Sequence, residues 1–201
     1  MTATSRKEKA AETEAALKDA AKRVFAAKGY LNTKITDITA EAGRAAGSFY
    51  NHFASKEELL ESLLADLAAA SDVNARQAGH SADFTDPEAV RWHVREYWTF
   101  HRDNAATMLA LRQAAMVNDD FARTFARFGA DQAADILDHL GYITAAGMEL
   151  PASERLSLAL MAELVNGFAH TWLLDRSVSE EEAVDALTRF IYRGFTGRDV
   201  S

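Results

Sequence analysis

Proline is nearly absent from this sequence, and its scarcity restricts the chain to few folds. Only Pro87 and Pro151 occur in 201 residues, beside abundant Ala, Leu, Glu and Arg. Those four residues favour helices, whereas proline breaks them. We find no strand pattern, no internal repeat and no low-complexity segment. The sequence therefore predicts an all-α protein.

Helical periodicity, capping residues and glycines predict about nine helices. Thr33 is expected to cap the second helix, and Gly43 to separate it from the third. Gly141 and Gly147 are expected to bracket a loop. The predicted helices cover about residues 10–28, 33–42, 44–51, 55–78, 87–103, 105–117, 119–140, 153–176 and 179–194.

The net charge of −8 conceals an uneven distribution of charge along the chain. Residues 1–56 hold ten Lys or Arg against six Asp or Glu, and all seven lysines lie there. Residues 57–201 hold twelve Arg against 24 Asp or Glu. This split indicates a small basic module attached to an acidic body, which is compatible with binding to nucleic acid through the module.

Residues 34–53, KITDITAEAGRAAGSFYNHF, have the pattern of a helix-turn-helix: two short helices around a glycine-containing turn. The second helix of such a motif enters the DNA major groove, so its side chains should be small or able to form hydrogen bonds. The candidates of this kind are Arg44, Ala45, Ala46, Gly47, Ser48, Tyr50, Asn51 and His52.

Residues from about 12 to 65 resemble the N-terminal domain of TetR-family transcriptional regulators. The matching pieces are AAKRVFAAKGY (20–30), T-x-I-x-D-I (33–38), EAG (41–43), GSFYNHF (47–53) and SKEEL (55–59). They occur in order at the family's spacing. The resemblance implies a helix-turn-helix domain over residues 10–56. It also implies a helical body over residues 57–201 that dimerises and binds a small ligand.

The resemblance also implies roles for single residues of the DNA-binding domain. Ser48 and Arg44 are placed to contact bases, and Lys34 and Thr36 complete the expected interface. The family often has a hydrophobic residue where Arg44 stands and Lys where Ala46 stands. The expected phosphate contacts are Thr33, Tyr50, His52 and Lys56.

The body is rich in large apolar side chains, which could form a ligand pocket or plain core. Polar groups such as Arg112, His101 and Asn166 would need partners among such faces, and a ligand could supply them. The apolar surroundings favour a mostly hydrophobic effector. The candidate ligand-binding residues are Tyr97, Trp98, His101, Met108, Arg112, Phe125, Met161, Phe168 and Trp172.

The last two predicted helices carry small residues among large ones, which would let another helix approach closely. They could form half of a four-helix bundle between two subunits, which is also the family's usual dimer arrangement. A helix pair within one chain is the alternative. The candidate interface residues are Ala159, Ala162, Asn166, Gly167, His170, Leu187 and Ile191.

Enzyme, metal and membrane functions find little support in the sequence. Without cysteine there is no disulfide, thiolate nucleophile or Cys-ligated metal. HExxH, P-loop and GxGxxG motifs are absent, and the six histidines lack the spacing of a zinc site. With no apolar run long enough for a bilayer and no signal-like N-terminus, we expect a cytoplasmic protein without cofactor or metal.

These observations favour a homodimeric, ligand-responsive DNA-binding regulator. We expect a repressor that a small, mostly hydrophobic effector releases from an inverted repeat in double-stranded DNA. The alternative is a helical-bundle small-molecule carrier, or a cofactor-independent enzyme, whose basic domain binds no specific DNA. Only the regulator predicts sequence-specific binding above the electrostatic background.

Overall fold

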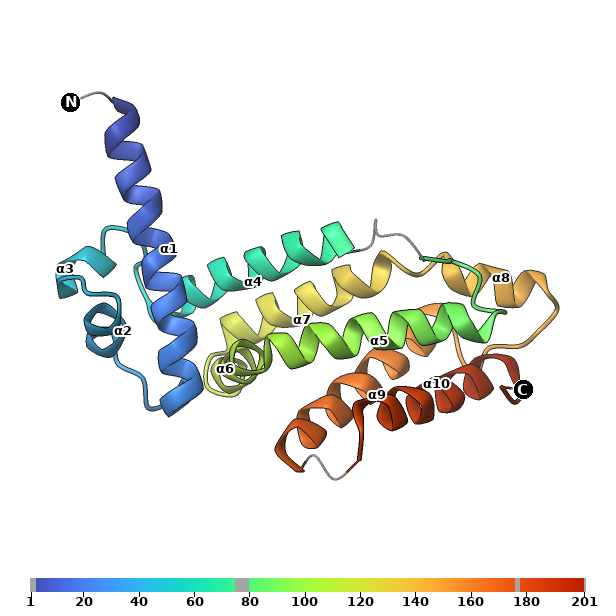
Figure 1. Ribbon diagram of the computed structural model, residues 1–201. Coiled ribbons are helices and arrows are strands. Elements are labelled where there is room, and N and C mark those ends of the chain that lie inside the picture. The colour runs from blue at the N-terminus through green and yellow to red at the C-terminus, as the bar shows by residue number, and fades with distance from the viewer. Residues whose placement is uncertain (1–2, 75–79, 176–177, 201) are drawn as a thin grey trace. The chain divides into compact units, whose positions relative to one another are not determined.

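The computed structural model describes residues 3–74, 80–175 and 178–200, and these are helical apart from turns and connections (Figure 1). The all-α prediction is confirmed. Within the described ranges no helix combines the length and the apolar character that crossing a bilayer requires. The helices are α1 (Ala3–Lys28), α2 (Ile35–Glu41), α3 (Ala46–Phe49), α4 (Lys56–Asn74), α5 (Pro87–Asp103), α6 (Ala105–Ala115), α7 (Asp119–Ala134), α8 (His139–Ala145), α9 (Glu154–Asp175) and α10 (Glu180–Thr196).

The described residues form ten helices where the sequence predicted nine, because the predicted helix 119–140 ends early. α7 stops at Ala134, and a new helix, α8, begins at His139. Gly141 therefore lies inside a helix and not at the edge of a loop. The turn between the helices lets Leu140 and Ile143 enter the core, where both are fully buried. Tertiary packing outweighs local helix propensity here.

Three helix ends also differ from the prediction. α2 begins after Lys34, whose backbone N–H donates to Asp37 Oδ2 at 2.9 Å, so Thr33 does not cap it. α1 begins near residue 3, because no glycine or proline interrupts its exposed first turns. α10 passes through Gly194 and ends at Gly197, which has the left-handed φ of +68° typical of helix ends.

Side-chain caps set the starts of two helices, α5 and α10. Asp86 Oδ1 accepts a hydrogen bond from the Glu88 N–H at 2.9 Å, with Pro87 as the first residue of α5. Ser179 Oγ accepts one from the Glu182 N–H at 3.2 Å at the start of α10. Both helices therefore begin where the sequence indicates.

Contacts divide the chain into two compact units. The N-terminal unit comprises residues up to Leu67 together with Ala106–Ala126, and the C-terminal unit comprises Ala68–Ala105 and the residues from Arg127 onward. The boundary passes through α4 and α7. The predicted domain boundary at residue 56 separates the expected DNA-binding segment from the rest of the chain, and it does not coincide with this boundary between packed units. It stays a prediction.

The N-terminal unit has its core where α1, α2, α3 and α4 bring their apolar faces together. α1 packs against α2, and α2 packs against α3 (Figure 1). Phe25, Ile38 and Phe49 are buried, and the rings of Phe49 and Phe53 lie 5.6 Å apart. Burial of each such side chain contributes roughly 1.5–3 kcal/mol. Helices as short as α2 and α3 would not be stable as isolated peptides, so packing against this core stabilises them.

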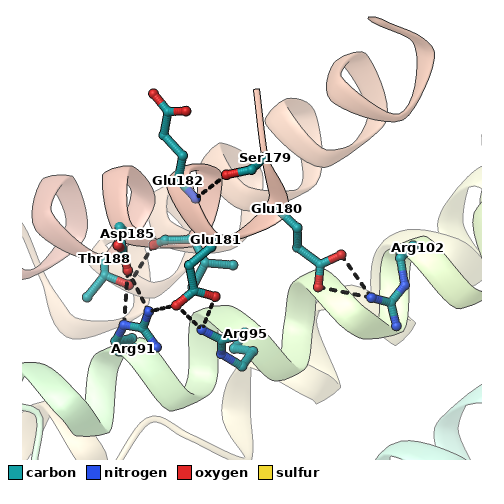
Figure 2. Close-up of polar contacts among 10 residues, drawn as sticks. Arg91, Arg95, Arg102, Ser179, Glu180, Glu181, Glu182, Asp185 and Thr188 are labelled. Atoms are coloured by element: carbon teal, nitrogen blue, oxygen red, sulfur yellow. Dashed lines mark hydrogen bonds and ion pairs between the residues drawn. The ribbon is translucent and has the colours of Figure 1, made fainter. Parts of the chain in front are cut away.

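The core of the C-terminal unit lies where α5 packs against α9 and α10 (Figure 1). Val94, Val165 and Val184 are fully buried there. Ion pairs cross the rim of the contact between α5 and α10, as Figure 2 shows. They join Arg91 to Glu181 and Asp185, Arg95 to Glu181, and Arg102 to Glu180. Exposed pairs add little stability, so apolar burial dominates and the ion pairs help to set the register of the helices.

Candidate nucleic-acid interface and ligand-binding residues

The turn between α2 and α3 is set by one glycine. Gly43 has a φ of +64°, which costs an L-residue about 1–2 kcal/mol. The turn is closed by the Arg44 N–H, which donates to the Thr39 carbonyl at 2.8 Å. The chain then enters α3 with Ala45 as its N-terminal cap residue. This local chemistry gives the motif the helix-turn-helix geometry predicted for residues 34–53.

Neighbouring residues of α3 and its end separate sharply into core and surface. Phe49 is fully buried, whereas the next residue, Tyr50, is 61% exposed and meets the Phe49 ring edge-on at 5.6 Å. Ala45, Ala46, Gly47 and Asn51 are also exposed, and Ser48 is half-buried. The structure thus leaves most of the predicted recognition residues accessible, and Lys34 and Thr36 of the α2 segment are exposed as well.

Gly47 is a glycine that the fold itself does not require. Its φ lies outside the left-handed region, and a Cβ atom built there would meet no atom within 4 Å. Most side chains could therefore be accommodated by the isolated chain. Glycine is otherwise used where another backbone or a ligand must approach closely. The missing side chain leaves room for a partner to approach the backbone at this surface.

Arg44 and His52 of the motif form weak contacts with carboxylates of α1. Arg44 Nη2 lies 3.5 Å from Glu12 Oε1, and His52 Nδ1 lies 3.9 Å from Glu14 Oε2. Arg44 Nε is buried without a hydrogen-bond partner among the described residues. Such long, partly exposed pairs contribute little. Both side chains could therefore exchange their carboxylates for a phosphate or a base at small cost.

Thr33 and Lys56 are held inside the N-terminal unit. Thr33 is 2% exposed, and its hydroxyl donates to the Gly29 carbonyl at 2.7 Å. Lys56 Nζ donates to the Tyr30 and Thr33 carbonyls at 3.1 and 2.7 Å, and partial burial lowers its pKa. This geometry argues against Thr33 as a phosphate ligand. Lys56 retains one N–H for an outside partner.

Tyr30 links three parts of the N-terminal unit. Its hydroxyl donates to Glu57 at the start of α4, and its backbone N–H donates to Gln113 Oε1 of α6 at 2.8 Å. Its ring centroid lies 4.2 Å from Lys56 Nζ, a cation–π contact. The tyrosine therefore connects the end of α1 to α4 and α6. The sequence showed it only as part of a family motif.

The nine predicted ligand residues are divided between the units. Met108, Arg112 and Phe125 belong to the N-terminal unit, and the other six belong to the C-terminal unit. Within the C-terminal unit the rings of Trp98 and Phe168 lie 6.1 Å apart, and Phe168 stacks on Trp172 at 5.7 Å. We call Trp98, Phe168 and Trp172 the aromatic cluster. Tyr97 packs on His101 at 4.7 Å.

Among the predicted ligand and interface residues of this unit, two buried polar atoms lack a hydrogen-bond partner within the described part of the chain. They are Nε1 of Trp98 and Oδ1 of Asn166. Leaving such an atom unpaired costs about 1–3 kcal/mol. Trp98 and Met161 are otherwise core residues, 2% and 7% exposed. Much of the predicted ligand set is therefore buried as part of the core. The two unpaired polar atoms could form hydrogen bonds with a ligand or water.

A surface hollow of about 460 Å³ lies elsewhere on the C-terminal unit. Its volume would admit a small organic molecule. None of the predicted ligand residues lines it. Its lining residues are Ala134, Asp135, Leu137, Asp138, Gly141 and Glu154.

Two of the predicted interface residues are covered within the chain. Leu187 and Ile191 are 5% and 4% exposed in the core of the C-terminal unit, because α10 turns this face to α5. Little of either side chain is therefore left exposed to a second subunit, and their place in an interface stays a prediction. Of the other predicted residues, Ala159 and Gly167 are exposed, and Ala162, Asn166 and His170 are half-buried.

A different apolar face of α9 and α10 is exposed. Leu156 and Leu160 of α9 are 52% and 55% exposed, and Phe190 of α10 is 70% exposed. Gly167 lies on the same stripe of α9, since residues 156, 160, 163 and 167 follow helical spacing, and Glu163 is the one charged residue of this stripe. The two leucines were missed, although their spacing in the sequence could have revealed them. We call Leu156, Leu160, Gly167 and Phe190 the exposed apolar face.

The structure also brings together three histidines that are distant in the sequence. One ring nitrogen each of His80, His93 and His139 lies within 4.8 Å of the other two. Burial, with smaller contributions from the other two histidines, lowers the pKa of His93 to about 4, so its ring is neutral at pH 7. The search for zinc motifs missed this group because its members follow no local spacing.

Comparisons with known proteins agree with these observations. Residues 17–63 match the family model for bacterial regulatory proteins of the tetR family. The HTH-type transcriptional regulator TtgR of Pseudomonas putida is 42% identical over 81 residues, which span 40% of this chain and 38% of TtgR. The match therefore covers well under two thirds of that relative.

Solved structures extend the likeness to nearly the whole chain. A bacterial regulatory protein in the tetR family from Rhodococcus RHA1 has a TM-score of 0.74 at 20% identity, covering 94% of this chain and 98% of that one. The regulator FadR from Bacillus subtilis, solved in complex with stearoyl-CoA, has a TM-score of 0.71 at 20% identity, covering 89% and 97%. At such identities the likeness establishes the fold alone.

Proposed function

We propose that this chain, which is a DNA-binding transcriptional regulator of the TetR family, acts as a homodimeric repressor whose release from DNA is controlled by a small, mostly hydrophobic effector. The observation that carries the proposal is the surface of α3. Tyr50 is exposed beside a buried Phe49, and Gly47 leaves an opening that the fold does not need. A basic N-terminal segment on an acidic chain supports the same conclusion.

Each exposed residue of the motif suits one part of a DNA duplex. Ala45, Ala46 and Gly47 allow the backbone to approach the bases. Arg44 and Ser48 offer the hydrogen bonds that distinguish bases in the major groove. The groups suited to phosphates are Lys34, Thr36, Tyr50, Asn51, His52 and the remaining N–H of Lys56.

When DNA binds, Arg44 and His52 would leave the carboxylates of α1. Arg44 and His52 face Glu12 and Glu14 in the free protein, and DNA would replace these carboxylates with phosphates or bases. Glu12 and Glu14 would then repel the phosphate backbone unless they turned away. The two acids thereby penalise loosely placed DNA and favour a closely fitted site.

The exposed apolar face of α9 and α10 supports a homodimer. Large apolar side chains such as Phe190, 70% exposed, are costly on a monomer surface. A second copy would cover this face, and Gly167 would let the two α9 helices approach closely. A two-fold dimer presents two identical recognition helices, so its operator would be an inverted repeat.

The effector would bind in the C-terminal unit near the aromatic cluster. Aromatic walls with a few polar groups are typical of ligand sites, and Trp98 Nε1 and Asn166 Oδ1 offer one donor and one acceptor. FadR, which shares the fold, is known in complex with stearoyl-CoA, a molecule with a long apolar chain. That complex makes an apolar effector reasonable for this chain.

Selection of bound fragments from the source genome, followed by a salt titration, tests the proposal. The DNA flanking the chain's own gene is the first candidate. A regulator binds one set of sequences at least about 10³-fold more tightly than other DNA. A carrier or enzyme with a basic domain would bind all fragments with similar affinity, and its affinity for all of them would fall in parallel as the salt concentration rises. Lower transcription from the bound promoter in vitro would identify a repressor, and higher transcription an activator.

A further inference from the structure

Three segments of the C-terminal unit each contribute one histidine to a single cluster. His80 lies before α5, His93 on α5 and His139 at the start of α8. The Nε2 atoms of His80 and His139 are 3.0 Å apart. The ring centroids of the three side chains lie 4.9–5.1 Å from one another. The imidazoles therefore converge on one point.

The hydrogen bonds around the cluster leave the inner nitrogens of His93 and His139 without protons. His93 Nδ1 lies 2.8 Å from the Ala89 carbonyl, and His139 Nδ1 lies 2.8 Å from Asp138 Oδ1. A carbonyl and a carboxylate only accept, so both Nδ1 atoms must donate. The Nε2 atom of each neutral ring then carries a lone pair. His93 Nε2 is buried and has no hydrogen-bond partner among the described residues.

This arrangement is the one that prepares histidine to bind a metal. In metal sites the second ring N–H is donated to a carbonyl or carboxylate, which fixes the ring and its tautomer. His93 and His139 are 8% and 4% exposed, and Phe84 packs against both rings. Leaving the buried Nε2 of His93 unpaired is costly, and a metal ion would remove that cost.

We propose that His80, His93 and His139 form a zinc site, with three imidazole ligands and a fourth position for water. Imidazole nitrogen suits zinc, whereas magnesium and calcium prefer oxygen ligands. Zn–N bonds of about 2.0–2.1 Å place tetrahedral ligands about 3.3 Å apart. The nitrogens here are 3.0 Å apart in one pair and within 4.8 Å in all, so modest ring movements complete the site.

Metal binding requires one change of tautomer. Without metal, His80 Nε2–H donates to the lone pair of His139 Nε2 across the 3.0 Å contact. With zinc, His80 places its proton on Nδ1 and turns its own Nε2 lone pair to the ion. His80 is exposed, which gives the metal a path from solvent. The ion would join the segment before α5 to α5 and α8, and so stabilise the C-terminal unit.

Zinc binding by the full chain tests the proposal directly. The protein is stripped with a chelator, dialysed, and titrated with zinc by calorimetry, with bound metal counted by mass spectrometry. We expect one zinc per chain. His80→Ala should weaken binding at least about tenfold, and Asp138→Asn about 10–100-fold, since that carboxylate orients His139. His52→Ala, in the N-terminal unit, is the matched control and should bind zinc as tightly as the wild type does.

Cobalt gives a second measurement that needs no variant. Co²⁺ held in a four-coordinate site by three imidazoles and a water shows visible absorption bands that hexaaquo cobalt lacks, and zinc should abolish them. His80 is exposed, so His80→Ala should fold, which circular dichroism can verify. Zinc affinity unchanged in His80→Ala, or less than one zinc per wild-type chain at saturation, would overturn the proposal. The histidines would then be a hydrogen-bonded core cluster.

Discussion

At the scale of single residues, a substitution at Gly47 should affect DNA binding and fold stability in different ways. Gly47→Leu should leave the free energy of unfolding unchanged or raise it by roughly 0.5–1 kcal/mol, because glycine is a poor helix former and the site is open. The same change should weaken DNA binding at least about tenfold, since the side chain would occupy the approach to the groove. Chemical denaturation and fluorescence anisotropy measure the two effects.

Gly129→Leu is the matched control for that variant. Gly129 is also exposed in a helix with open space around its Cβ position, but it lies on α7. It should gain similar stability and keep full DNA binding. If Gly47→Leu bound DNA as tightly as this control, α3 would not be the surface that contacts DNA.

Lys34 and Arg44 should differ in the kind of binding energy they supply. Lys34 is exposed, and Lys34→Ala should weaken binding to all sequences and reduce the salt slope by about 0.9. Arg44→Ala should cost about 1–3 kcal/mol on the operator and little on other DNA. Affinities measured over a range of salt, on operator and scrambled duplexes, distinguish the two. If Arg44→Ala lost the same binding free energy on both duplexes, Arg44 would contact a phosphate and not a base.

At the scale of elements, the contact between Tyr30 and Glu57 connects the end of α1 to α4. Burial opposes ionisation of Glu57, but hydrogen bonds, chiefly from the Tyr30 hydroxyl, lower its pKa below the usual 4.5. The carboxylate therefore stabilises the fold above about pH 4.5 and loses this contribution as pH falls through the lowered pKa.

Glu57→Gln should consequently flatten the loss of stability on acidification. Urea unfolding midpoints measured between about pH 6 and pH 3 would show the change in slope. Tyr30→Phe removes the same hydrogen bond from the other side and should give a similar, smaller flattening. A wild-type slope in both variants would show that this contact contributes nothing to acid stability.

At the scale of the whole molecule, the exposed apolar face predicts how two chains associate. Gly167→Glu should break the proposed dimer, because a carboxylate buried without a partner costs several kcal/mol. The chain itself should stay folded, since a Cβ at residue 167 meets nothing within 4 Å. Sedimentation equilibrium gives the mass, and Gly129→Glu is the control. A Gly167→Glu protein that still dimerises would place the interface elsewhere.

Local chemistry could be read from the sequence because it depends on neighbouring residues. The spacing of Ile38, Phe49 and Phe53 specifies one apolar face, and Gly43 specifies the turn, all within about twenty residues. Asp86 and Pro87 likewise indicate the start of α5 before any packing is known. The same local pattern includes the segment that matches the tetR family.

The tertiary structure decided which of these faces meet. Leu187 and Leu160 look alike in the sequence, yet the first is buried against α5 and the second is 55% exposed. Periodicity shows that a helix has an apolar face, but the element that covers it can lie a hundred residues away. His80, His93 and His139 illustrate the same limit, because only the packing of α5 and α8 brings their nitrogens within 4.8 Å.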